Sequence, residues 1–116
     1  MSIVELLTVL RNSPTEKFAV FYHTTQGVFG RIMAEGDERG VKFDWGQVVD
    51  EARRVRAAKV SIAHNHPSGE VRPSTKDLEA TFALQDVFKE FGLSLHDHVI
   101  VGPAGKPFSM RNKGVI

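Results

Sequence analysis

The stretch AHNHPSG, residues 63–69, places His64 and His66 two positions apart at the end of a short run with alternate β-branched residues, residues 59–63. Such a run is typical of a strand. Side chains two apart on a strand share a face, so both imidazoles can converge on one point at its end. Asp77 follows eleven residues after His66. The trio predicts a metal site with three protein ligands and an open fourth position, which is the arrangement of a catalytic zinc.

The segment between the histidines and Asp77 predicts a loop followed by a helix. Pro67, Gly69 and Pro73 mark the loop. Ser74 fits a helix N-cap with Asp77 at the third helical position, so the carboxylate can point back toward the strand end. The same pair also fits an ordinary capping box that needs no metal. The combined motif favours a metal ion, and the alternative is a degenerate site that keeps the fold without the ion.

The composition is that of an ordinary soluble globular domain. The chain has 116 residues, of which 41% are hydrophobic and 25% charged, and its net charge of +1 indicates no particular partner. The absence of cysteine excludes disulfides, thiolate zinc ligands and a cysteine nucleophile. No run has the length of a membrane span, and the N-terminus lacks a signal-peptide pattern. A cytoplasmic location is therefore the default expectation.

Strand-like and helix-like segments alternate along the chain. This order predicts an α/β or α+β fold, a sheet with helices on its faces. We expect one domain over residues 1–116, with an N-terminal helix in 1–12 and a core in 17–116. The expected helices cover 2–11, 45–57 and 74–91, and the expected strands cover 17–23, 28–35, 59–63, 93–101 and 107–110.

Two further segments accompany the metal motif. Residues 97–102, DHVIVG, and 109–114, SMRNKG, follow it in order. With these segments the chain resembles the RadC-like branch of the JAMM/MPN (JAB) metallopeptidase superfamily over residues 17–116. The resemblance implies a twisted β-sheet flanked by helices, in a cytidine-deaminase-like layout. It also implies the catalytic domain alone, without the helix-hairpin-helix region of many longer RadC proteins.

The resemblance carries an activity and a set of roles. It implies a zinc ion held by His64, His66 and Asp77, and hydrolysis of a peptide or isopeptide bond in a peptide or protein tail. Zinc activates a water molecule and polarises the substrate carbonyl. A carboxylate is expected to accept the proton of that water. Ser74 matches the motif serine that would donate a hydrogen bond to the oxyanion.

The general base is where the match departs from the family. The family's base is a glutamate on an early strand, a few residues before a Gly-Thr pair that corresponds to Gly36-Asp37 here. Counting back places Arg31 at the glutamate position. Glu35 has the parity of Arg31 and is the first substitute, although four strand residues span about 13 Å. Glu38 and Glu70 are further carboxylates that could reach from loops.

Three functions stay open at this stage. The first is a zinc peptidase, and the second is a catalytically inactive binding module, which the arginine at the base position favours. The third is a nucleic-acid-associated protein whose basic cluster contacts phosphates, although a solvated helix face explains the same residues: Arg53, Arg54, Arg56 and Lys59. His96 and His98 could each lie near the metal or serve as partly buried histidines with backbone partners.

Overall fold

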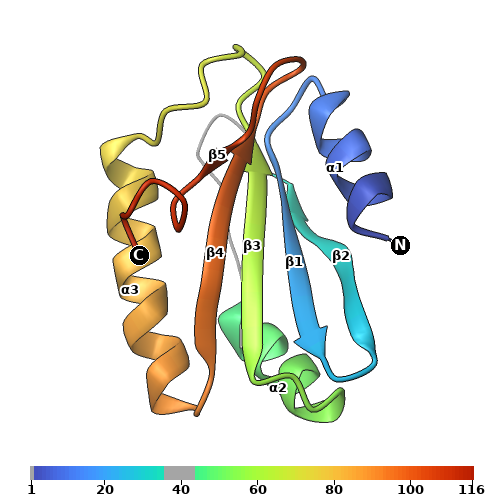
Figure 1. The fold of residues 1–116 in the computed structure, drawn as a ribbon, viewed down its shortest axis with the longest axis vertical. Helices are drawn as coiled ribbons and strands as arrows, with labels where there is room; N and C mark the ends of the chain where they lie inside the picture. The colour runs from blue at the N-terminus through green and yellow to red at the C-terminus, as the bar shows by residue number, and fades with distance from the viewer. Residues whose placement is uncertain (1, 36–43) are drawn as a thin grey trace.

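A five-stranded mixed sheet organises the chain (Figure 1). The computed structural model describes residues 2–35 and 44–116. In this part of the chain the helices are α1 (Ile3–Arg11), α2 (Trp45–Arg54) and α3 (Thr75–Glu90). The strands are β1 (Lys17–Thr24), β2 (Gly27–Glu35), β3 (Lys59–Asn65), β4 (Ser94–Val101) and β5 (Phe108–Ser109). The expected sheet flanked by helices is confirmed.

The strand order is β2-β1-β3-β4-β5. β1 pairs antiparallel with both β2 and β3, and β4 pairs antiparallel with β5. β3 and β4 are parallel, and α3 forms the crossover between them, because parallel neighbours need a long connection. Figure 1 shows α3 beside the β4 side of the sheet and α1 beside β1 and β2. The crossover therefore starts at the end of β3, where the paired histidines lie.

Two apolar clusters hold the helices against the two faces of the sheet. One joins α2 and α3 to the face that contains Val20 and Ile62. The other joins α1 to the opposite face, through Leu6 and Leu10 packed near Ala63. Burial of these side chains supplies the main stabilisation. The described helices include none that is both long and apolar enough to cross a membrane.

A register shift changes which side chains of β4 face α3. Val60 pairs with Leu95, but Ser61 pairs with Asp97 and Ile62 with His98. His96 is the additional residue of this β-bulge, which interrupts the alternation of side chains along the strand. The bulge separates His96 from His98, although the two residues have the same parity in the sequence.

Gly30 lies in β2, close to Leu6 of α1. A Cβ atom at this position would lie 2.6 Å from the Val20 carbonyl oxygen and 2.8 Å from Leu6 Cδ1. We expect Gly30→Ala to lower the free energy of unfolding by about 1–3 kcal/mol, since the backbone and α1 must move apart. Urea unfolding followed by circular dichroism measures this loss. Gly46→Ala is the matched control, and an equal loss in both variants would contradict the packing argument.

Candidate metal site

The paired histidines lie at the end of β3, on the face that α3 covers. His64 is completely buried, and its ring stacks on Phe18 of β1 at a centroid distance of 4.5 Å. His66 follows the last residue of the strand, and its Nε2 lies 3.0 Å from His64 Nε2. The two ring nitrogens therefore face one common point, as the spacing of the residues predicts.

Asp77 reaches the same point from the first turn of α3. Its Oδ1 lies 3.3 Å from His64 Nε2, and its Oδ2 lies 3.2 Å from His66 Nε2. The capping box is also present, because Asp77 N donates to Ser74 Oγ and Ser74 N donates to Asp77 Oδ2. The cap and the convergent carboxylate are thus two properties of one structure. The N-cap geometry aims Asp77 at the histidines.

The electrostatics of the site keep the Asp77 carboxyl ionised. Burial raises its pKa, but the neighbouring His64 imidazole and the hydrogen bonds with Ser74 together favour the charged form more strongly, so the net shift is downward. An ionised carboxylate is the form that coordinates a metal ion. The pKa shift therefore fits a ligand as well as a helix cap.

A hydrogen bond at Nδ1 of His66 determines which ring nitrogen has a lone pair available for the cluster. His66 Nδ1 lies 2.7 Å from the Glu70 carbonyl oxygen, which can only accept. Nδ1 therefore carries a proton, and in the neutral form of the ring Nε2 is the acceptor. Metal-ligating histidines commonly donate their other N–H to such a backbone carbonyl.

The distances in the cluster match the size of a zinc ion. Zinc bonds of about 2.0–2.1 Å in a tetrahedron separate neighbouring ligand atoms by about 3.3 Å. His64 Nε2 and His66 Nε2 lie 3.0 Å apart, and each lies 3.2–3.3 Å from one oxygen of Asp77. Nitrogen and carboxylate ligands also suit zinc chemically. The residues present therefore fit the group that the resemblance implies.

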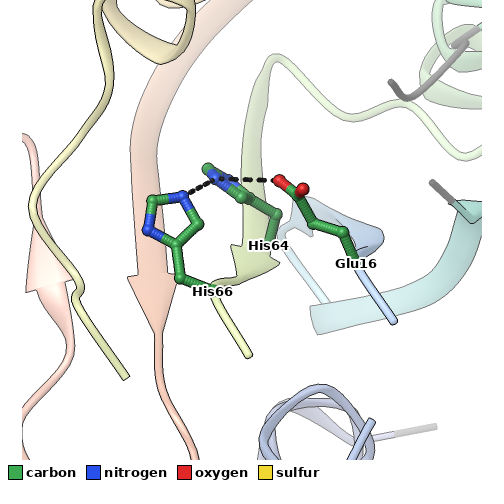
Figure 2. Close-up of side chains that lie close together, drawn as sticks. All are labelled: Glu16, His64 and His66. Atoms are coloured by element: carbon green, nitrogen blue, oxygen red, sulfur yellow. Dashed lines mark hydrogen bonds and ion pairs between the residues drawn. The ribbon is translucent and has the colours of Figure 1, made fainter. Parts of the chain in front are cut away.

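Glu16 is a second carboxylate at the cluster, and the sequence analysis missed it. Its Oε1 lies 3.8 Å from His64 Nε2, and the potential ligand atoms of Glu16, His64 and His66 all lie within 4.8 Å of one another. Figure 2 shows Glu16 and His66 approaching His64 from two sides. The Glu16 side chain is 40% exposed. It therefore borders solvent, whereas His64 is enclosed.

The pairing of β1 with β3 explains the position of Glu16. Phe18 lies opposite His64 in this antiparallel pair. Glu16 precedes Phe18 by two residues, so continuation of the register carries it toward His66. An acidic residue directly before a strand rich in apolar residues was the available signal. It became informative only once the partner strand and its register were known.

Asn65 holds the segment that carries Glu16. It lies between the two histidines in sequence, and its side chain is 1% exposed. Asn65 Oδ1 accepts from Lys17 N at 2.7 Å, and Asn65 Nδ2 donates to the Thr15 carbonyl at 2.9 Å. A longer bond of 3.3 Å reaches the Ser13 carbonyl. The Asn65 side chain thus bonds the backbone on both sides of Glu16 and holds this residue beside β3.

Truncating this amide is expected to be costly. We expect Asn65→Ala to lower the free energy of unfolding by about 2–3 kcal/mol, because it leaves buried backbone groups without partners. Urea unfolding of the metal-free protein measures the loss. Asn12→Ala is the matched control, since the Asn12 amide makes an exposed bond to the Thr8 carbonyl. If Asn65→Ala lost no more free energy of unfolding than the control, the hydrogen bonds of Asn65 would not stabilise the fold as we infer.

The two residues considered for the family's base position lie on β2. Arg31 Nη2 forms an ion pair with Glu51 Oε1 of α2 at 2.8 Å. Glu35 ends β2 with its Cα opposite Lys17. A bulge between Ile32 and Ala34 interrupts the alternation, so the parity argument does not extend from Arg31 to Glu35.

Three further features of that segment lie outside the described part of the structure: the Glu35 side chain, the Gly36-Asp37 pair and Glu38. The role of Glu35 as a base therefore stays a prediction.

His96 and His98 have different surroundings. The His96 ring lies 4.9 Å from the His23 ring. His98 is 1% exposed and lies beside His64, with its Nε2 2.8 Å from His64 Nδ1. Burial, together with the neighbouring His64, lowers the pKa of His98 to about 3, so its ring is neutral. Of these two histidines, only His98 adjoins the cluster.

The five-stranded sheet with a histidine pair at the end of β3 is the arrangement of a JAB/MPN-like domain. Comparison with known families agrees: the RadC-like JAB domain family matches residues 2–115. The chain belongs to this family. The resemblance inferred from the motif and its flanking segments is thereby confirmed.

Curated relatives support the same assignment. A UPF0758 protein of Ruegeria pomeroyi is 33% identical over 113 residues, covering 94% of this chain and 49% of the relative. A UPF0758 protein of Acidithiobacillus ferrooxidans is 36% identical over 111 residues, covering 94% and 49%. One of Clostridium botulinum is 40% identical over 70 residues, covering 60% and 30%. The chain thus spans about half the length of these relatives.

Proposed function

We propose that this domain is a zinc-dependent hydrolase of peptide or isopeptide bonds, with His64, His66 and Asp77 as the zinc ligands. The observation that carries the proposal is the 3.0–3.3 Å spacing of their ligand atoms around one point. When bound, zinc acidifies a water molecule and polarises the carbonyl of the bond to be cut. Two imidazoles and one carboxylate leave the fourth position open, as catalytic zinc sites do.

Glu16 is the general base in this proposal. Its carboxylate lies beside His64 on the exposed side of the cluster, where an attacking water must enter. Glu16 accepts a proton from that water and returns it to the leaving amine. Its single, longer contact of 3.8 Å to the cluster favours this role, because Asp77 contacts both imidazoles at shorter distances. The position of Glu16 supports the hydrolase over the inactive module that the arginine at the base position favours.

Ser74 is the third participant in the proposed reaction, after the zinc ion and the general base Glu16. Its Oγ accepts a hydrogen bond from Asp77 N at 3.0 Å, so the hydroxyl proton is left for donation. We assign this proton to the oxygen that becomes negative when water attacks the carbonyl. Ser74 therefore stabilises the oxyanion, while the same residue caps α3. The substrate class is a peptide or a protein tail, which can enter beside the exposed side chain of Glu16.

The basic residues around the end of α2 do not favour a nucleic-acid-associated function over the hydrolase. Arg54 forms an ion pair with Glu51 at 2.6 Å, and the Arg53 guanidinium lies 5.3 Å from the centre of the Phe91 ring. Two of the four cations of this cluster thus have intramolecular partners. A solvated helix face with favourable charges near its C-terminus accounts for them.

The test combines zinc loading with an unbiased search for cleavage. Zinc-loaded protein is incubated with a mixture of synthetic peptides that includes isopeptide-linked ones, and mass spectrometry detects new termini. We expect cleavage that a chelator abolishes and added zinc restores. The double variant His64→Ala/His66→Ala is the matched control. Stoichiometric zinc without cleavage above this control would replace the hydrolase with a metal-containing binding module.

A further inference from the structure

A chain of buried polar groups extends from the back of His64 into the core. His64 Nδ1 lies 2.8 Å from His98 Nε2, and His98 Nδ1 lies 2.7 Å from Thr81 Oγ1. Thr81 Oγ1 in turn lies 2.7 Å from the Asp77 carbonyl oxygen. His64, Thr81 and His98 are each at most 1% exposed. Water therefore does not compete for these bonds, and their protons must be shared within the chain.

The proton of the Thr81 hydroxyl decides the direction of the chain. A hydroxyl has one proton, and the Asp77 carbonyl can only accept. Met110 Sδ, 3.3 Å from the same oxygen, is likewise an acceptor. If Thr81 donates to the carbonyl, its oxygen accepts from His98 Nδ1–H. The neutral His98 ring then accepts at Nε2 from His64 Nδ1–H, and every donor in the chain has an acceptor.

The opposite direction would place a proton in the metal cluster. If Thr81 donated to His98 Nδ1, His98 Nε2–H would donate to His64 Nδ1. A neutral His64 would then carry its proton on Nε2, which faces His66 Nε2 at 3.0 Å. A protonated nitrogen cannot coordinate a metal ion. The direction of the chain thus decides whether His64 can act as a ligand.

We propose that Thr81 and His98 are positioning residues that hold His64 in its Nδ1–H form, so that its Nε2 lone pair faces the metal. This inference rests on the proposed function, because it assumes coordination through Nε2. Thr81 and Asp77 are one helical turn apart on α3. The helix that supplies the carboxylate ligand therefore also supplies the group that orients the proton of a histidine ligand.

Three proteins test the inference: wild type, Thr81→Val and Thr81→Ser. Valine has nearly the shape of threonine but cannot accept a hydrogen bond, whereas serine keeps the hydroxyl. Competition with a chelator of known affinity measures zinc binding. We expect Thr81→Val to bind zinc about 10–100-fold more weakly, which is the range for changes to residues that support a metal ligand. We expect the zinc affinity of Thr81→Ser to stay within a few-fold of wild type. Equal affinity of wild type and Thr81→Val would overturn the inference.

A spectroscopic measurement on wild-type protein needs no variant to fold. Nitrogen-15 shifts of the imidazole rings in zinc-loaded protein distinguish Nδ1–H from Nε2–H in each histidine. We expect Nδ1–H in both His64 and His98. A proton on His98 Nε2 would overturn this inference alone, because zinc would still be bound. A wild-type protein that binds no zinc would overturn the proposed function together with the inference.

Discussion

Glu16→Gln is expected to keep zinc and to lose hydrolysis. Glutamine has the shape of glutamate but cannot accept a proton from water at neutral pH. Removal of a general base lowers turnover by about 10²–10⁴-fold. Zinc should remain stoichiometric, because His64, His66 and Asp77 keep their mutual contacts of 3.0–3.3 Å. Elemental analysis and the peptide-cleavage assay, carried out on the same preparation, measure both properties.

The control for this variant is Glu70→Gln. The Glu70 side chain is 59% exposed and pairs with Arg72, while only its backbone carbonyl contacts His66. We expect Glu70→Gln to leave both zinc content and turnover near the wild-type values. Loss of zinc in Glu16→Gln would instead identify Glu16 as a fourth ligand. Full activity with zinc retained would remove Glu16 as the base and make Glu35 the next carboxylate to substitute.

Asp77→Asn is expected to weaken zinc binding by at least about 100-fold. Changes to residues that hydrogen-bond a metal ligand already lower metal affinity about 10–100-fold, so removal of a charged ligand should lower it more. Asparagine keeps an oxygen that can accept from Ser74 N, so the N-cap of α3 is largely preserved. The loss of affinity can then be attributed to the missing charge and not to a frayed helix. Chelator competition measures the affinity.

Ser74→Ala separates the two roles of the capping box. It removes the hydroxyl that accepts from Asp77 N but leaves the carboxylate beside the histidines. We expect a loss of about 1 kcal/mol in the free energy of unfolding, as for other N-cap truncations, and a zinc affinity within a few-fold of wild type. If Asp77→Asn bound zinc as tightly as Ser74→Ala, Asp77 would be a helix cap and not a ligand.

The sequence by itself determined the local parts of this structure. Alternating β-branched residues before His64 predicted the strand, and the Ser74–Asp77 pair predicted the N-cap of α3. Both patterns act over a few residues, so spacing along the chain is enough to find them. The convergence of His64, His66 and Asp77 followed from the same spacing, because one loop joins the strand to the helix.

Only the tertiary structure decided which distant side chains join them. Glu16 reaches the cluster because β1 pairs with β3 in one register, with Phe18 opposite His64. His98, and not His96, lies behind His64 because a bulge in β4 shifts the alternation of side chains. Strand partners, register and bulges depend on packing between segments far apart in sequence. No local pattern encodes them, since a shift of one residue turns every side chain of a strand to the other face.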